Sequence, residues 1–241
     1  MREFLPRPSI APAAVWAFPS PRRARLSNGI ELMIFDLPGQ HVIAAHLVLD
    51  VPLNAERRDI EGVATMCART LDEGTQRHNG EEFAELLENE GAGFGVDLSL
   101  SGMQIVLDVP ASHLERALEL FTEAVIEPSL GDRDVNRHVQ LRLAEIEQAQ
   151  ANSAQTASMA FRAAVFDEAT RAARMSGGEP DTVRQVTPAA VTAFHHDHFG
   201  PSGATLVLAG DFVEDPIAVA ERCLGSWRNE DQHQVSIQEP T

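Results

Sequence analysis

Residues 93–109 read GFGVDLSLSGMQIVLDV, and their pattern predicts the class of fold. Apolar side chains occupy alternate positions in two runs: Phe94, Val96, Leu98 and Leu100, then Ile105 and Leu107. Ser101-Gly102 separates the two runs. Strict alternation is typical of strands with one buried face, and a short break that contains glycine is typical of a hairpin turn. The chain should therefore contain an antiparallel sheet.

Helices are expected on both sides of this hairpin. On its N-terminal side, Asn79 and Glu82 have the spacing of a capping box, and apolar residues at helical spacing follow until Gly91. On its C-terminal side, Ser112 and Glu115 predict a second capping box, for a helix that closes before the next proline. The hairpin is thus expected between two amphipathic helices.

Further strands and helices are expected farther from the hairpin. Ser27-Asn28-Gly29 carries the strongest turn signal and separates short strands at residues 25–26 and 30–35. The remaining expected elements are a strand at 42–49, a helix at 61–71 stopped by Gly74, helices at 132–150, 154–166 and 187–198, a strand at 204–209 and a helix at 217–224. Because hairpins and groups of helices follow one another without regular β-α-β alternation, the sequence predicts an α+β fold. Its form should be a two-layer sandwich, with helices packed on a mostly antiparallel sheet.

The chain is expected to form one domain with short extensions at both ends. Residues 24–225 contain all the expected elements. Residues 1–23 are interpreted as an N-terminal arm, because Pro6, Pro8 and Pro12 interrupt its apolar stretch. Residues 226–241 form a polar tail.

The charge of the chain argues against two classes of partner. The formal net charge is −17, from 36 acidic and 19 basic side chains, and every basic side chain is Arg. An acidic surface repels phosphate backbones and anionic lipids. Nucleic acid and membrane partners are therefore not expected, and the patch Arg22, Arg23 and Arg25 is interpreted as the solvated start of a strand.

Cysteine usage and the start of the chain favour a cytoplasmic location. Cys67 and Cys223 lie far apart without C-x-x-C spacing, which indicates neither a disulfide framework nor a thiolate metal site. The N-terminal residues lack the pattern of a secretory signal. No run approaches the ~18 apolar residues that a membrane-spanning helix needs.

The order of these elements resembles one structural repeat of the pitrilysin family, which includes insulysin and the mitochondrial processing peptidases. Three local patterns carry the resemblance: Leu26-Ser27-Asn28-Gly29 before a strand, Gly62-Val63-Ala64 leading to Gly74-Thr75, and Pro201-Ser202-Gly203-Ala204-Thr205-Leu206 through Gly210-Asp211. The resemblance covers about residues 24–225. Full chains of the family usually hold two such repeats, so the resemblance implies that residues 226–241 are either a tail or the start of a linker to a second repeat.

Active members of this family carry an inverted zincin motif, H-x-x-E-H, on a helix, and a further Glu ligand lies well downstream. The two His positions share one helical face and hold one cation, while the Glu acts on bound water as a general base. Alignment on Gly62-Val63-Ala64 puts Thr65 and Arg69 at the His positions and Ala68 at the Glu position. Thr is a poor zinc ligand, Ala accepts no proton, and a guanidinium repels a divalent cation. The resemblance therefore implies that catalysis by this mechanism is absent and that no metal cofactor is bound.

Glu145 is the one position where a ligand of the family survives by spacing, 76 residues after Arg69. We expect Arg69 to take the place of the metal and to form an ion pair with Glu145, as a guanidinium–carboxylate fork. In the alternative arrangement, Arg69 points outward and Glu145 is one more exposed acid on an acidic helix. Gly95 also departs from the family, since many active members carry Asn there.

Two other groups of residues resemble binding sites, one for a metal ion and one for a nucleotide, but lack the required arrangement. His195, His196 and His198 occupy neighbouring helical positions that do not all face one cation, so we interpret them as structural. The run Gly91-x-Gly93-x-Gly95 follows a helix and enters a strand, the reverse of the context that nucleotide binding requires.

Three functions are compatible with these residues. The favoured hypothesis is a non-catalytic peptidase-like domain that binds a peptide or pairs with an active H-x-x-E-H subunit, in a dimer or hetero-oligomer. The second is a zinc-dependent metallopeptidase with non-standard or partner-supplied ligands, in which Glu145 would contribute. The third is a purely structural subunit.

Overall fold

The computed structural model describes residues 17–237, and six strands form one sheet within that range. The strands are β1 (Arg22–Arg25), β2 (Glu31–Asp36), β3 (Val42–Leu49), β4 (Gly93–Ser99), β5 (Gly102–Pro110) and β6 (Thr205–Gly210). Their order across the sheet is β1-β2-β6-β3-β5-β4. Every neighbouring pair is antiparallel except β2 and β6, which run parallel. The predicted hairpin of residues 93–109 is thus formed by β4 and β5, at one edge of the sheet.

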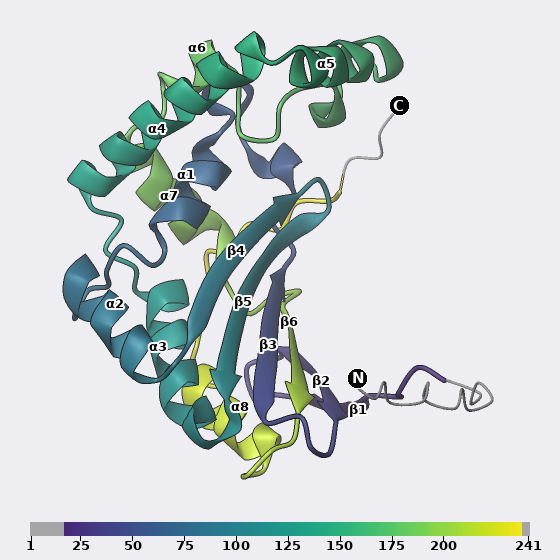
Figure 1. Cartoon of the computed structure of the whole chain (residues 1–241), viewed down its shortest axis with the longest axis vertical. Coiled ribbons are helices and arrows are strands. Elements are labelled where there is room, and N and C mark those ends of the chain that lie inside the picture. The colour runs from purple at the N-terminus through teal and green to yellow at the C-terminus, as the bar shows by residue number, and fades with distance from the viewer. Residues whose placement is uncertain (1–16, 238–241) are drawn as a thin grey trace, which may run out of the picture.

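Eight α-helices accompany the sheet in the described part of the chain. They are α1 (Val63–Thr70), α2 (Gly80–Asn89), α3 (Leu114–Ile126), α4 (Asp132–Ala151), α5 (Ser153–Val165), α6 (Pro180–Val183), α7 (Pro188–His198) and α8 (Pro216–Leu224). Together the elements form a crescent (Figure 1). Helices α2, α3 and α8 lie along one side of the sheet, and α4 and α5 curve over one end of it. The predicted α+β sandwich is confirmed, with one parallel strand pair in a mostly antiparallel sheet.

The core lies between the sheet and the helices behind it. Alternate residues of the central strands are fully buried on this side: Ile43, Ala45 and Leu47 of β3, Ile105 and Leu107 of β5, and Leu206 and Leu208 of β6. Leu118 and Phe121 of α3 join the same cluster, and so does Trp227 beyond α8. The period-two pattern of the strands therefore selects the face that meets the helices.

Of the two predicted capping boxes, one is present in the structure and the other is not. Asn79 and Glu82 form the expected reciprocal capping box at the start of α2. Ser112 does not cap α3, because it lies in a 3-10 turn, Ala111–His113, and α3 begins at Leu114 without a side-chain cap. A capping residue needs extended dihedrals, which a residue inside a helical turn does not have. That expectation was wrong.

The terminal extensions lie partly outside the described residues. Of the arm expected at 1–23, residues 1–16 are outside, and of the tail expected at 226–241, residues 238–241 are outside. In the described chain, no helix combines the length and apolar character that a membrane span would require.

Candidate functional site

Helix α1 carries the motif positions, and a buried carboxylate holds its start. Gly62 precedes the helix at φ +108°, a left-handed conformation that suits glycine. The backbone N–H groups of Gly62 and Ala64 donate to Glu56 Oε1 at 2.8 and 3.0 Å. A carboxylate at this end satisfies free N–H groups and complements the positive end of the helix dipole.

Glu56 belongs to a buried cluster of two acids and two arginines. Its side chain is fully buried, and Arg171 donates to Glu56 Oε2 from Nε at 3.1 Å and from Nη2 at 2.9 Å. Arg174 donates to Glu61 Oε2 at 2.7 Å. Burial raises the pKa of Glu56, and Arg171 and the two backbone N–H groups oppose this effect. The cluster ties the segment before α6 to the start of α1, and no local pattern in the sequence predicted it.

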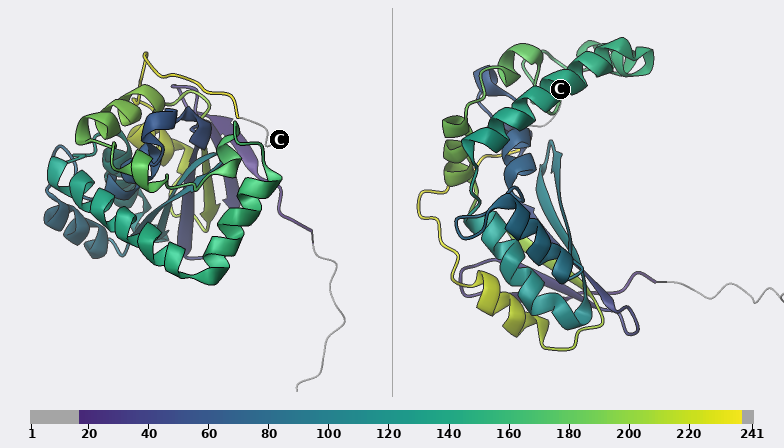
Figure 2. Two further views of the ribbon diagram at one scale, coloured as in Figure 1. Left: turned by 90° about the horizontal axis from the view of Figure 1, so that it is seen from above. Right: turned by 60° about the vertical axis from the view of Figure 1, so that its left-hand side comes forward.

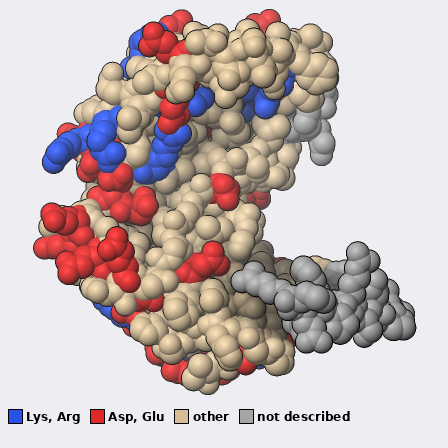
Figure 3. All heavy atoms as spheres, viewed as in Figure 1, with Lys and Arg blue, Asp and Glu red and all other residues tan. Residues whose placement is uncertain are grey.

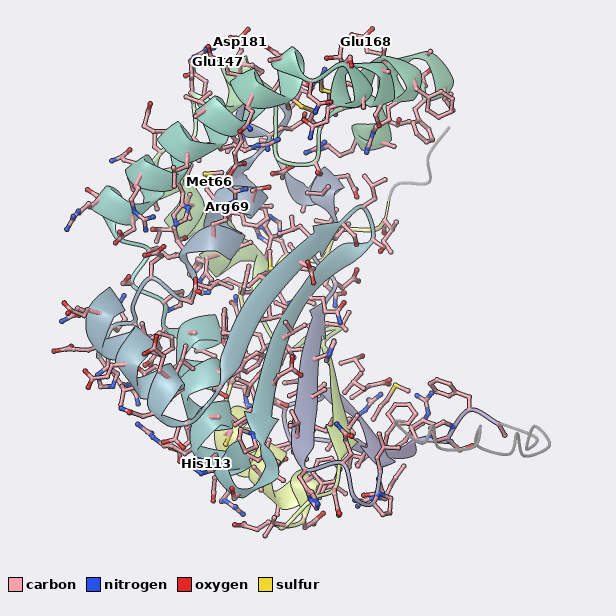
Figure 4. The ribbon with its side chains drawn as sticks, in the orientation of Figure 1. Met66, Arg69, His113, Glu147, Glu168 and Asp181 are labelled. Carbon is pink, nitrogen blue, oxygen red and sulfur yellow. The ribbon has the colours of Figure 1, made fainter. Side chains whose placement is uncertain are left out.

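Arg69 projects from α1 (Figure 4) and meets Glu145 of α4. Arg69 Nη1 donates to Glu145 Oε1 at 2.8 Å, and Nη2 donates to Oε2 at 2.9 Å. Of the two arrangements open to Arg69, the structure therefore contains the two-pronged fork. Thr65 lies one helical turn before Arg69 and is partly buried, and Ala68 beside them is buried.

Two arginines hold the carboxylate of Glu145. Hydrogen bonds from Arg69 lower the pKa of Glu145, and Arg142 adds to the effect. Arg142 Nη1 donates to Glu145 Oε2 at 3.2 Å, and its Nε donates to the carbonyl oxygen of Gly177 at 3.0 Å. Because Arg69 and Glu145 are 33% and 43% exposed, the pair adds little to stability. The pair places a permanent cation between α1 and α4, beside Thr65 and Ala68.

The residues at the motif positions do not fit a zinc ion. Zinc in proteins takes imidazole, thiolate and carboxylate ligands, and of the four residues concerned only Glu145 offers one. Both oxygens of that carboxylate already accept hydrogen bonds from Arg69. Among residues 17–237, no three His, Cys, Asp or Glu side chains lie close enough together to hold a metal ion.

A hollow of about 410 Å³ opens beside the fork. Its walls come from α1, the strand β4 and α4, as follows: Ala68, Arg69, Asp72 and Glu73; Phe94, Gly95 and Val96; His138, Leu141 and Glu145. On the face drawn in Figure 3, arginines gather over α4 and acidic side chains over α2. The surroundings of the hollow thus carry both charges, while Phe94, Val96 and Leu141 supply apolar surface.

The acids of this hollow differ in their surroundings. Burial raises the pKa of Asp72. Partial burial acts on Glu73 in the same direction, but hydrogen bonds from Arg137 and His138 hold the pKa of Glu73 below its usual range. His138 Nε2 lies 2.8 Å from Glu73 Oε1. Arg137 and His138 therefore hold the carboxylate of Glu73, as Arg69 and Arg142 hold that of Glu145.

The strand β4 forms one wall of the hollow and is also an edge of the sheet. It pairs with β5 on one side and is the last strand in the order, so its other side has no strand partner in the described chain. Gly95 leaves this part of the wall without a side chain. An unpaired edge presents backbone N–H and C=O groups to an incoming chain.

The three neighbouring histidines make separate contacts. His195 Nε2 lies 2.8 Å from the carbonyl oxygen of Val125, and His198 Nδ1 lies 3.3 Å from that of His233. His196 is exposed and contacts Asp197. They do not converge on one point, in agreement with their interpretation as structural residues.

Comparisons with known proteins agree with this architecture. The family model described as insulinase (peptidase family M16) matches residues 34–177, more than half of the chain. The chain belongs to the M16 peptidase family. An M16 domain described as inactive, from Pseudomonas fluorescens, superimposes with a TM-score of 0.83 at 20% identity, over 92% of this chain and 54% of that one. Pitrilysin superimposes with a TM-score of 0.76 at 18% identity, over 92% of this chain and 24% of its own.

A curated relative has a similar level of identity to this chain. An uncharacterized zinc protease from Rickettsia felis is 20% identical over 206 residues, which is 85% of this chain and 50% of that protein. The chain thus spans about half the length of the curated relatives it matches. The solved M16 structures support the fold alone at these identities.

Proposed function

We propose that this chain is a non-catalytic domain of the M16 family that binds an extended peptide along the edge of β4. The observation that carries the proposal is the fork between Arg69 and Glu145, 2.8 and 2.9 Å long. It puts a guanidinium at the place where the resemblance puts a metal ligand. Ala68 beside it has no group that accepts a proton from water.

The geometry beside the fork supports peptide binding. An extended peptide gains main-chain hydrogen bonds when it adds to a free sheet edge, and pockets along the edge then select its side chains. The hollow of about 410 Å³ borders β4 at Phe94, Gly95 and Val96. A peptide laid along β4 would place side chains against Leu141 and Phe94.

A second role, pairing with an active subunit, has separate support. One similar structure is an M16 domain described as inactive, and the chain spans about half the length of its curated relatives. Under this proposal an intact H-x-x-E-H subunit would supply the catalysis, and the present domain would hold part of its substrate. The two roles are compatible, because both use the edge of β4 for binding rather than for hydrolysis. The cytoplasmic location remains part of the proposal, on the ground of the two free cysteines.

The first test is a measurement of metal and activity on the purified full chain. We expect far less than one zinc per chain, and no chelator-sensitive cleavage of an unfolded polypeptide such as reduced and alkylated casein. Close to one zinc per chain together with chelator-sensitive cleavage would overturn the non-catalytic reading and favour the metallopeptidase alternative.

The second test is hydrogen exchange with and without peptides made from the same casein. We expect amides of Gly93–Ser99 in β4 to gain protection when peptide is added. The opposite edge, β1 at Arg22–Arg25, is the internal control and should not change. Equal protection at both edges, or none at β4, would reject this binding mode and leave a structural role.

A further inference from the structure

One carboxylate in the hollow beside the fork has no cationic partner. Arginines pair with the other two acids of its lining, Glu73 at 2.5 Å and Glu145 at 2.8 Å. Asp72 lines the same hollow, and among the described residues no arginine or histidine lies within ion-pair distance of it. The negative charge of Asp72 is therefore available to a group that enters the hollow.

The position of Asp72 favours a cation. It follows helix α1, which ends at Thr70, and the C-terminal end of a helix carries partial negative charge. Asp72 is exposed, so an incoming group can reach it. The walls around it nevertheless exclude enough water to raise the pKa of its carboxyl. A cation paired with Asp72 compensates for this loss of hydration.

The other walls of the hollow suit an aliphatic stem. Phe94 and Val96 of β4 and Leu141 of α4 line it, and Leu141 is 46% exposed. Methylene groups that cover such a surface are removed from water, and an aromatic ring also attracts a cation near its face. Lysine and arginine side chains combine an apolar stem with a terminal charge. A metal ion fits less well, because Asp72 belongs to no group of three metal-ligating side chains in the described chain.

A strand added at β4 would point side chains into the hollow. Phe94 and Val96 pack against the core beneath the helices, so the hollow lies on the helix side of this edge. Successive residues of a strand point to opposite faces, and every second residue of an added strand therefore points to that side. Beyond the hollow, β4 continues to the hairpin, which ends below the arch of α4 and α5 (Figure 2, right). A bound strand can thus present one residue to Asp72 while its neighbours pair with the edge.

The charges around the hollow favour the same ligand. The chain has a net charge of −17, and acidic side chains gather over α2 on the face drawn in Figure 3. The lining of the hollow carries three carboxylates and one guanidinium, and that guanidinium, of Arg69, already donates to Glu145. A field of this sign attracts a basic peptide and repels an acidic one.

We propose that the hollow beside the fork selects a basic side chain, lysine or arginine, from a peptide bound along β4, and that Asp72 pairs with its charge. The stem of the basic residue lies against Phe94, Val96 and Leu141. This inference rests on the proposed function, because the peptide at β4 supplies the basic residue. It makes Asp72 the residue that determines specificity.

Three synthetic peptides test the proposal on the purified full chain. They share a seven-residue extended sequence, and the central residue is lysine, norleucine or glutamate. Norleucine keeps the aliphatic stem and removes the ammonium group. We expect calorimetry at low salt to show roughly tenfold tighter binding of the lysine peptide than of the norleucine peptide, as for a hydrogen bond to a charged group. Equal binding, or tighter binding of the glutamate peptide, would overturn the proposal.

Substitutions then assign the preference to one side chain. In Asp72→Asn, the lysine and norleucine peptides should bind equally, and unchanged binding of the norleucine peptide shows that the edge of β4 is intact. Asp181→Asn is the matched control, because it changes the net charge equally and Asp181 lies on α6, outside the hollow, with its side chain 98% exposed. A preference that survives in Asp72→Asn, or that is lost in both variants, would contradict the role of Asp72.

Hydrogen exchange separates failure of this inference from failure of the proposed function. If the norleucine peptide protects amides of Gly93–Ser99 and the lysine peptide binds no more tightly, peptide binding at β4 stands and the selection of a basic residue is rejected. If neither peptide protects β4, binding along this edge is rejected, and the inference is rejected with it. Protection at β4 together with a preference that depends on Asp72 supports both.

Discussion

Arg69 on α1 and Glu145 on α4 are joined by two hydrogen bonds of 2.8 and 2.9 Å, although 76 positions separate them in the sequence. A guanidinium and a carboxylate match each other in this geometry, because two N–H groups face two oxygens. The pair places a permanent positive charge between α1 and α4.

If the motif positions are assigned correctly, restoring three side chains should restore zinc binding. We expect the combined variant Thr65→His, Ala68→Glu and Arg69→His to bind about one zinc per chain, with Glu145 as the third ligand. Two imidazoles one turn apart and a freed carboxylate supply the ligands that the present chain lacks. Metal content after dialysis measures the effect, and the same variant with Glu145→Gln is the control. A folded triple variant without zinc would show that these positions do not align with the motif.

The buried cluster at the start of α1 should dominate the stability of this region. Glu56→Ala removes the carboxylate to which Arg171, 3% exposed, donates two hydrogen bonds, and leaves Glu61 at 3.8 Å as the remaining acid beside this buried guanidinium. Loss of one member of a buried pair costs about 3–5 kcal/mol in the free energy of unfolding. Urea unfolding measures this change.

A surface pair provides the comparison for the buried cluster. Arg116 and Glu119 form an exposed pair at 2.7 Å on α3, and Arg116→Ala should cost at most about 1 kcal/mol. If Glu56→Ala and Arg116→Ala destabilise the protein equally, the buried cluster does not anchor α1.

His195 should make the protein sensitive to acid. Burial lowers the pKa of His195 below its ordinary value of 6.5, despite its hydrogen bond to the carbonyl oxygen of Val125. The unfolded chain then binds the proton more readily than the folded one, so the contribution of His195 is complete above pH 6.5 and is lost as the pH falls through the folded pKa. We expect His195→Gln to reduce the loss of unfolding free energy between about pH 7 and pH 5. Urea titrations at several pH values measure it.

His196 is the matched control for this prediction. It lies next to His195 on α7 but is exposed to solvent. His196→Gln should leave the pH dependence of stability unchanged. An equal effect of both substitutions would indicate a general charge effect rather than the burial of His195.

Local patterns in the sequence determined many of the elements of this fold. The strand Val42–Leu49 was predicted with its observed bounds, because its alternate apolar residues have the period of a strand. The capping box of Asn79 and Glu82 formed as expected, since both residues act within one turn of backbone. The α+β class followed from the order of such elements. The motif positions on α1 came from the resemblance to the pitrilysin family, and the partner of Arg69 came from spacing along that alignment.

Tertiary structure decided what depends on contacts between distant segments. Glu56 and Arg171 are 115 positions apart, and neither their types nor their spacing distinguishes them from the many other acids and arginines of this chain. Ser112 lost its capping role because the turn after β5 draws it into a 3-10 helix. The insertion of β6 between β2 and β3 aligns apolar side chains from three separate segments on one face of the sheet, around a hollow of about 450 Å³. Periodicity tells which side chains share a face of one element, but only packing of the elements tells which faces meet and which stay open.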